Sequence, residues 1–223
     1  MRTRPVVTID GPSGAGKSTV SKKLAERVGF VRLDTGAMYR TCALAARRAG
    51  IPWSDANRLG ELARGMALSF RDAAGIAGVF LAGEDVSEAI RTPEMSMGAS
   101  DVSALLPVRE ALVAKQREMA RDGGVVLEGR DTGTVVFPDA EAKFFLDAAA
   151  AVRALRRYRE EPPRKGQAFE QVLKDVLRRD VQDCTREHSP LKMAEGAVYI
   201  DSTILTVEEV VEIMERSVRG AAR

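Results

Sequence analysis

Short runs of apolar residues alternate along the chain with longer segments in which apolar positions recur every three or four residues. The runs predict buried strands, and the longer segments predict amphipathic helices. Main-sheet strands are expected at residues 5–10, 30–33, 125–127, 143–146 and 198–200, and helices at 19–28, at 37–48 and from a capping box that begins at Thr206. Strands that alternate with helices are typical of a parallel sheet with crossover connections, so the pattern predicts an α/β fold with five parallel strands.

The pattern changes between Trp53 and Leu106. Two short apolar runs at residues 68–71 and 79–81 are separated by glycine-rich turns, and residues 83–85 predict a further turn. This pattern predicts a small antiparallel β unit inserted into the parallel sheet. We expect residues 53–106 to form a substrate subdomain within one domain that spans residues 1–223. Residues 153–165 form a second predicted surface element, which is rich in arginine and ends near Pro162.

The segment Gly11-Pro12-Ser13-Gly14-Ala15-Gly16-Lys17-Ser18 fits the pattern G-x-x-x-x-G-K-[ST] of a phosphate-binding loop, the P-loop. In such a loop the backbone N–H groups surround the phosphates and the lysine reaches the β and γ phosphates. Glycines allow the backbone to turn sharply and approach an anion without a clash at Cβ. A strand is predicted before the segment and a helix after it, so the positive end of the helix dipole would face the phosphates. The segment therefore predicts a nucleotide-binding loop.

Net charge and hydropathy limit the kinds of partner that this protein is expected to bind. The net charge of +2 is too small to predict nucleic-acid binding. Lys and Arg outnumber Asp and Glu between residues 151 and 192, which favours a surface that faces small anions. The first predicted strand begins by Pro5, which leaves no room for a signal peptide, and no apolar run approaches membrane-spanning length. We expect a cytoplasmic protein that binds neither nucleic acid nor membranes.

Cysteine and histidine usage excludes some metal sites. Cys42 and Cys184 lie far apart in the sequence, which is typical of reduced thiols that serve in packing. His188 is the only histidine, so a zinc site made of several His and Cys ligands is excluded. A Ser-His-Asp triad stays formally possible, although the neighbours of His188 indicate the end of a helix rather than a catalytic centre.

The rest of the sequence narrows the phosphate chemistry. The N-K-x-D motif that reads guanine is absent, because Asn57 is the only asparagine and Arg58 follows it. The chain also lacks the long second domain that a motor or transporter ATPase needs. A short chain with a P-loop and arginine-rich elements indicates phosphoryl transfer to a small acceptor.

Several arginines are candidates for binding phosphate. Arg40 lies one turn into the second predicted helix, and Arg130 follows the third main-sheet strand, at the strand ends where α/β sheets bind ligands. Arg153 and Arg157 are four residues apart and share a helix face. Positions 179 and 186, both arginine, are seven residues apart, and we expect them two turns apart on one face of a single helix.

Several segments, in order along nearly the whole chain, resemble the bacterial cytidylate kinase family. They are residues 11–18, 33–40, 83–91, 128–138 and 179–191, which include Gly83-Glu84-Asp85-Val86-Ser87 and Gly129-Arg130-Asp131-Thr132-Gly133-Thr134. Glu128 and Thr35 differ from residues that are frequent in relatives but keep the functional group. The resemblance implies a nucleoside monophosphate kinase core of five parallel strands with a monophosphate-binding insert and a short lid at residues 153–165. It also implies the reaction ATP + CMP (or dCMP) ⇌ ADP + CDP (or dCDP).

The resemblance also implies residue roles. ATP would bind to Gly11, Pro12, Ser13, Gly14, Ala15, Gly16, Lys17, Ser18 and Thr19, with Mg²⁺ on the Ser18 hydroxyl. The cytosine would face Ser100, Arg109 and Asp131, the ribose Arg179 and Asp183, and the acceptor phosphate Arg40, Arg130 and Arg186. Thr35 and Tyr39 would line the acceptor site, and Arg153 and Arg157 would serve the donor side and the lid. The expected catalytic residues are Lys17, Arg130, Arg153, Arg157 and Arg186.

This chemistry needs no strong base, because the CMP phosphate is already a dianion near neutral pH. The obstacle is repulsion between two polyanions, which cationic clamps, in-line positioning and exclusion of water overcome. Two alternatives stay open. One is another P-loop small-molecule kinase, acting for example on a different monophosphate or on shikimate, and the other is a nucleotide-binding module without activity. We expect a monomer whose partners are small nucleotides.

Overall fold

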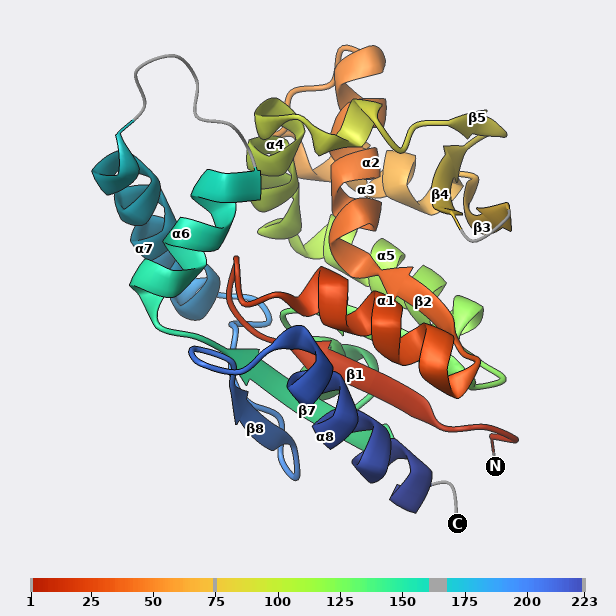
Figure 1. Ribbon diagram of the computed structural model, residues 1–223. Helices are drawn as coiled ribbons and strands as arrows, with labels where there is room; N and C mark the ends of the chain where they lie inside the picture. Colours follow the sequence, from red (N-terminus) through yellow and green to blue (C-terminus); the bar gives the residue numbers. More distant parts are fainter. Residues whose placement is uncertain (1, 74–75, 161–167, 222–223) are drawn as a thin grey trace. The chain divides into compact units, whose positions relative to one another are not determined.

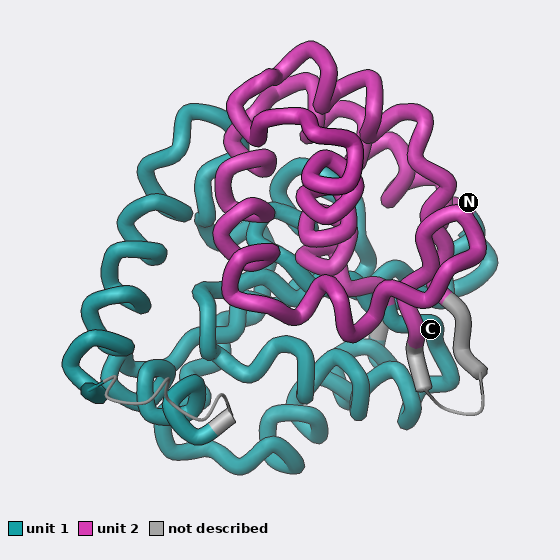
Figure 2. Tube along the Cα trace, turned by 90° about the horizontal axis from the view of Figure 1, so that it is seen from above, with its two compact units in different colours: residues 1–32, 122–223 teal, residues 33–121 magenta. Residues whose placement is uncertain are grey.

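The structure is a computed structural model, and it describes residues 2–73, 76–160 and 168–221. The chain divides into two compact units (Figure 2). Unit 1 consists of Met1–Arg32 and Asp122–Arg223, and unit 2 consists of Leu33–Arg121. The predicted insert, residues 53–106, falls inside the range of unit 2, which is wider.

The main sheet confirms the predicted α/β fold. Its strands are β1 (Val6–Asp10), β2 (Val31–Asp34), β6 (Val125–Gly129), β7 (Ala142–Asp147) and β8 (Val198–Asp201). They lie in the order β2-β6-β1-β7-β8, with parallel pairing of β1 to β6, β1 to β7 and β7 to β8. Every residue of β1 and β6 is buried, as expected of apolar strands at the centre of a parallel sheet. The register pairs Asp10 with Gly129, so both strands end at the same edge.

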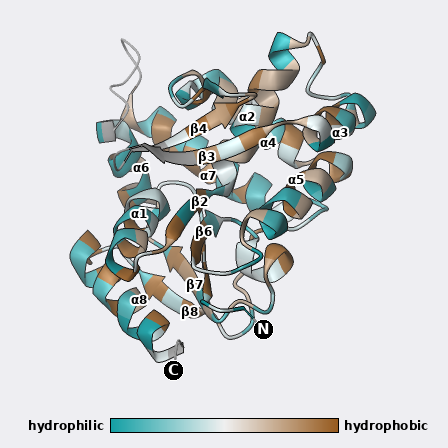
Figure 3. Ribbon diagram, turned by 90° about the vertical axis from the view of Figure 1, so that its right-hand side faces the viewer, coloured by the Kyte–Doolittle hydropathy of each residue, from teal (hydrophilic) through white to brown (hydrophobic). Residues whose placement is uncertain are grey.

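Helices α1 (Lys17–Val28) and α8 (Val207–Ala221) lie side by side against this sheet (Figure 1). Leu24 of α1 and Met214 of α8 are fully buried in one apolar cluster with Ile9 and Phe144 of the strands. The opposite face of α8 is polar, which Figure 3 shows as teal patches between brown ones. The helix begins at the predicted capping box, in which the Thr206 N–H donates to Glu209 Oε2 at 2.8 Å.

The remaining elements of unit 1 are α6 (Ala150–Glu160), α7 (Phe169–Thr185) and a short π-helical turn, η2 (Thr132–Val136). Helices α6 and α7 pack against each other, and the rings of Tyr158 and Phe169 meet edge to face with centroids 6.1 Å apart. Of the predicted lid, residues 153–160 belong to α6, and residues 161–165 lie outside the described residues. The lid therefore stays a prediction.

Unit 2 combines helices with a small antiparallel sheet, as predicted. Its helices are α2 (Thr35–Arg48), α3 (Ala56–Gly65), η1 (Ala89–Arg91), α4 (Pro93–Ser103) and α5 (Leu106–Met119). Its strands are β3 (Leu68–Ala73), β4 (Ile76–Leu81) and β5 (Glu84–Asp85), which pair antiparallel in that order. Cys42 is fully buried in the core of this unit together with Met38 and Leu59, which confirms its predicted packing role, whereas Cys184 of α7 is exposed and the same prediction for it was wrong.

The segment Gly83-Glu84-Asp85-Val86-Ser87 serves the architecture of unit 2. The Glu84 carboxylate accepts two hydrogen bonds of 2.8 Å from Arg48 at the end of α2. Val86 is fully buried, and the Ser87 hydroxyl accepts from the Val79 N–H at 2.9 Å. This segment therefore joins the small sheet to the helices.

No helix in the described ranges 2–73, 76–160 and 168–221 is long and apolar enough to cross a membrane.

Substitution of Gly11 by alanine is expected to destabilise unit 1. Gly11 has a φ of +151°, and a Cβ there would overlap the carbonyl oxygen of Leu146 in β7. Steric overlap and an unfavourable φ together predict a loss of about 3 kcal/mol in the free energy of unfolding, measured in urea. Gly220→Ala is the matched control, because a Cβ at Gly220 meets open space and alanine favours a helix. Equal stability of the two variants would contradict this explanation.

Candidate active site

The P-loop connects the end of β1 to the start of α1. Its glycines at 11, 14 and 16 have φ values of +151°, +79° and +93°, so three of its residues adopt a backbone that L side chains rarely take. Gly16 is the N-cap of α1, and Lys17 is the first helical residue, two residues earlier than predicted. The N–H groups at the start of α1 have no partner within the helix, so they are suited to an anion.

The Lys17 side chain is buried with only 7% of its surface exposed. Its Nζ donates to the carbonyl oxygen of Pro12 at 2.7 Å. Burial and the positive charge of Arg130 lower the pKa of Lys17 well below its ordinary value, and nearby carboxylates offset part of this effect. A phosphate in this position would supply the negative charge that stabilises the ammonium group.

A polar cluster surrounds the P-loop serine. Ser18 Oγ donates to Glu128 Oε2 at 2.8 Å, and Ser21 Oγ donates to Glu128 Oε1 at 2.9 Å. Arg32 Nε donates to the same Oε1 at 3.0 Å. Hydroxyl and carboxylate oxygens are the ligands that Mg²⁺ prefers, so Ser18 and Glu128 fit a magnesium ion that arrives with nucleotide phosphates. Within the described part of the chain, three or more His, Cys, Asp or Glu residues do not gather into a metal-binding group.

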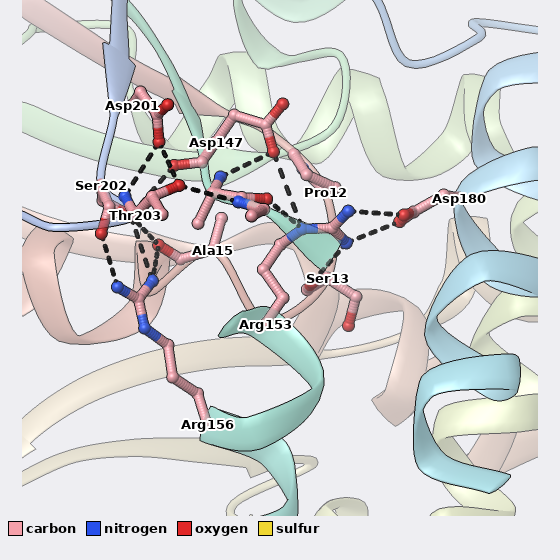
Figure 4. Close-up of polar contacts among 12 residues, drawn as sticks. Pro12, Ser13, Ala15, Asp147, Arg153, Arg156, Asp180, Asp201, Ser202 and Thr203 are labelled. Carbon is pink, nitrogen blue, oxygen red and sulfur yellow. Dashed lines mark hydrogen bonds and ion pairs between the residues drawn. The ribbon is translucent and has the colours of Figure 1, made fainter. Parts of the chain in front are cut away.

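Helix α6 supports the P-loop through the two arginines that were predicted to share a helix face, of which Figure 4 shows Arg153. Arg153 Nη1 donates to the carbonyl oxygen of Ser13 at 3.1 Å, and Arg157 Nη1 donates to Ser13 Oγ at 2.9 Å. Both therefore lie on one face of α6, as predicted. Arg153 is buried and also forms a two-point ion pair with Asp180 of α7, with distances of 3.0 and 2.7 Å.

A third arginine of α6, Arg156, also supports the site and was not predicted from the sequence. Its Nη1 donates to the Ala15 carbonyl at 3.3 Å and to Ser202 Oγ at 3.0 Å, and its Nη2 donates to the Ser202 carbonyl at 2.7 Å. Figure 4 shows this side chain reaching from α6 towards the loop that follows β8. The only sequence signal for Arg156 is its position three residues after Arg153, because the partners of Arg156 lie far away along the chain.

Three of the predicted arginines gather around Asp183, a buried residue of α7. Arg130 Nε donates to Asp183 Oδ2 at 2.7 Å. Burial of Asp183 opposes ionisation, but the charges of Arg130, Arg179 and Arg186 outweigh it, so the pKa of Asp183 lies below its ordinary value. The structure therefore brings together Arg130 from the end of β6, Arg179 from within α7 and Arg186 from the residue that follows α7.

The prediction that Arg179 and Arg186 share one helix was wrong. Helix α7 ends at Thr185, and Arg186 is extended with φ −62° and ψ 142°. Proline cannot continue a helix and disfavours helical backbone before it, which explains an end ahead of Pro190. The chain then turns back, and the Leu191 N–H donates to the Asp183 carbonyl at 2.8 Å. Arg186 still reaches the cluster because of this turn.

The loop after β6 carries Asp131. Arg186 Nη2 lies 3.8 Å from Asp131 Oδ1. A residue predicted to face the cytosine is therefore next to one predicted to face the acceptor phosphate. The next residues, Thr132 and Gly133, donate to the carboxylate of Asp10 at the end of β1. Burial raises the pKa of Asp10, and these hydrogen bonds offset part of the increase.

The other predicted substrate residues lie in unit 2. The Asp34 carboxylate caps α2 by accepting from the Ala37 N–H at 2.9 Å, and it also accepts from Arg40 Nη2 at 3.0 Å. Arg109 of α5 is buried, with its guanidinium 5.6 Å from the centre of the Tyr39 ring. Arg109 Nη1 donates to the Ser103 carbonyl at 3.0 Å. Thr35 is buried at the start of α2, and Ser100 is half-buried on α4.

A parallel sheet with a P-loop after one of its central strands, together with arginines that gather around Asp183, is the arrangement of a P-loop kinase. The chain has the same fold as a gluconokinase from Sinorhizobium meliloti 1021, with a TM-score of 0.52 and 18% identity over 100% of this chain and 95% of that one. The cytidylate kinase family model matches residues 7–220. The chain is 55% identical to a cytidylate kinase from Geobacter sp. (strain M21) over 96% of this chain and 92% of the relative. It is 53% identical to one from Geobacter sulfurreducens over 98% of this chain and 94% of the relative. The chain belongs to the cytidylate kinase family.

Asp183→Asn is expected to destabilise the protein most at neutral pH. Because the pKa of Asp183 is lowered in the folded state, its stabilisation is present above about pH 4 and is lost as the pH falls through the folded value. Removal of the Asp183 charge leaves three partly buried arginines without this counter-charge, which predicts a loss of at least about 2 kcal/mol in the free energy of unfolding at pH 7. Urea unfolding at pH 7 and pH 3 measures the difference, which should shrink at pH 3.

The control for this variant is Glu187→Gln, which removes a carboxylate from an exposed position beside the same cluster. It should unfold like the parent protein at both pH values. A stability difference for Asp183→Asn that is equal at pH 7 and pH 3 would show that the ionised carboxylate does not hold the arginines.

Proposed function

We propose that this protein transfers the γ-phosphate of ATP to CMP, and also to dCMP, to give ADP and CDP or dCDP. The observation that carries the proposal is the position of the P-loop and of Arg130 at the ends of two paired strands. Strand β1 leads into the P-loop and β6 leads into Arg130, and the register pairs Asp10 with Gly129, so a loop for the donor phosphates begins beside a group for an acceptor phosphate. Family membership over nearly the whole chain supports CMP as the acceptor.

On the donor side, we propose that ATP binds to residues 11–19. The P-loop N–H groups and Lys17 would bind the β and γ phosphates, and the Ser18 hydroxyl, held by Glu128, would bind Mg²⁺. When bound, the ion would neutralise charge that develops between the β and γ phosphates. Arg153 and Arg157, both hydrogen-bonded to Ser13, would keep the loop in place and add positive charge beside the transferred group.

On the acceptor side, we propose that arginines bind the CMP phosphate, because a planar guanidinium matches phosphate oxygens at two points. The phosphate dianion needs only to be positioned in line and shielded from water. The proposed phosphate residues are Arg40, Arg130 and Arg186, and the proposed ribose residues are Arg179 and Asp183. Thr35 and Tyr39 would line the acceptor site near Arg40.

Cytosine recognition needs a donor for O2 and N3 and an acceptor for the 4-amino group. We propose that Arg109, helped by Ser100, is the donor and that Asp131 is the acceptor. UMP has a carbonyl where CMP has the 4-amino group, so the Asp131 carboxylate would disfavour UMP. A site built to hydrogen-bond one base strongly rejects a base that lacks the matching group, because a buried polar group of the site then has no hydrogen bond. We further propose that the protein acts as a monomer in the cytoplasm.

The test is an ADP-release assay with ATP and a panel of acceptors: CMP, dCMP, UMP, AMP and shikimate. The proposal predicts the largest kcat/KM for CMP and dCMP. A preference for AMP, UMP or shikimate would favour a different small-molecule kinase. ADP release with none of these acceptors would leave a nucleotide-binding module as the better description.

Lys17→Ala is expected to lower kcat by at least about 100-fold, in line with the loss of one preorganised charge donor to the transferred phosphate. Lys22→Ala, at an exposed position on the same helix, is the matched control and should keep the parent kcat. Circular dichroism checks that both variants are folded. A folded Lys17→Ala variant with near-parent kcat would refute the assignment of the P-loop.

Asp131→Ala is expected to reduce kcat/KM for CMP by about tenfold to a hundredfold and to reduce the value for UMP less. The ratio of the two acceptors is an internal control for folding, because both are measured with the same protein. An alternative is that Asp131 only pairs with Arg186 and orders the loop. In that case both values would fall by the same factor.

A further inference from the structure

We infer that Asp10 is a positioning residue that keeps the Asp131 carboxylate away from its own helical turn and so directed to the nucleotide base. The inference deepens the proposed function and rests on it for the role of Asp131. Neither the P-loop pattern nor the predicted base site includes Asp10, which is the last residue of β1 and is only 2% exposed.

Asp10 accepts three hydrogen bonds from the residues that follow Asp131. Its Oδ1 accepts from the N–H of Thr132 at 2.9 Å and from Thr132 Oγ1 at 2.8 Å. Its Oδ2 accepts from the N–H of Gly133 at 2.7 Å. All three donors lie more than 120 residues away in sequence, so Asp10 fixes the loop after β6 to the strand that leads into the P-loop.

Two of these donors are the first N–H groups of the turn η2, those of Thr132 and Gly133, and the N-cap of this turn is Asp131. An aspartate at an N-cap ordinarily accepts from the second or third N–H of its own helix. The Asp131 side chain makes no such capping bond. Asp10 therefore caps the turn in its place, and the Asp131 carboxylate is directed to Arg186 instead, at 3.8 Å.

Two further observations support this arrangement. Burial raises the pKa of Asp10 and the charge of Asp131 adds to this increase, so repulsion between the two carboxylates opposes a turn of Asp131 towards the same N–H groups. A Cβ at Gly133 would lie 2.9 Å from Thr8 Oγ1 and 3.4 Å from Asp10 Oδ2. The backbone at this point thus lies against the end of β1, where only a glycine fits without displacing its neighbours.

Removal of the Asp10 charge should release the N–H groups and attract Asp131. Asp10→Asn keeps the side-chain shape but replaces one acceptor oxygen by an NH₂ group, which cannot accept from the backbone. The Asp131 carboxylate would then cap its own turn, and the base would lose its acceptor. We expect the CMP-to-UMP ratio of kcat/KM to fall about tenfold through a higher KM for CMP.

The experiment compares the parent with Asp10→Asn, Asp131→Asn and the double variant. Because both substitutions remove the same base contact, the double variant should have the CMP-to-UMP ratio of Asp131→Asn alone. Thr8→Val is the matched control on β1. Its Oγ1 is buried without a hydrogen-bond partner in the described residues, so the ratio should not change. A second variant, Asp10→Ser, replaces Asp10→Asn if the latter does not fold.

A crystal structure of ligand-free Asp10→Asn supplies a readout independent of activity. It should show an Asp131 oxygen within about 3.2 Å of the Gly133 or Thr134 nitrogen. The inference is overturned if Asp131 keeps its place beside Arg186, if Asp10→Asn lowers CMP and UMP activity equally, or if the ratios of the two single variants multiply in the double variant. An unchanged ratio in Asp131→Asn would instead refute the proposed base contact and leave the crystal structure to decide the capping role.

Discussion

The ion cluster around Asp183 is the interaction on which the site depends. Arg130, Arg179 and Arg186 carry like charges, and their mutual repulsion would separate them if no anion were present. Asp183 provides that anion within α7, and the lowered pKa of this carboxylate reflects the same attraction. The repulsion between the guanidinium groups is therefore overcome during folding, before an acceptor phosphate binds. Preorganised charge of this kind is what a reaction between two polyanions requires.

Two elements that come much later in the sequence than the P-loop support it, one on each side. On one side, Arg153 and Arg156 of α6 contact Ser13 and Ala15 (Figure 4), and Arg157 also contacts Ser13. On the other side, Glu128 at the end of β6 contacts Ser18. The Arg153–Asp180 pair then joins this support to α7, the helix that carries Asp183. The groups proposed for donor and acceptor phosphates in unit 1 thus share one connected set of polar contacts.

Much of the fold could be predicted from the sequence, because strands, crossover helices and the P-loop are encoded locally. The five strands follow from short apolar runs, and the glycines of the P-loop follow from the backbone conformations that a phosphate requires. The support of the site could not be predicted in the same way. The partners of Asp10 and Arg156 lie more than a hundred residues away or on loops without a pattern. For Arg186, the spacing from Arg179 fits a helix, but the turn before Pro190 ends the helix earlier, and tertiary contacts bring the side chain back.

The central claim is that phosphate leaves ATP and becomes bonded to CMP, rather than being released into water. ³¹P NMR of one sample containing the protein, ATP, Mg²⁺ and CMP follows each phosphorus atom directly. The account predicts that the γ signal of ATP and the single signal of CMP decline together while the two coupled signals of CDP increase at the same rate. Growth of inorganic phosphate with the CMP signal unchanged would contradict it.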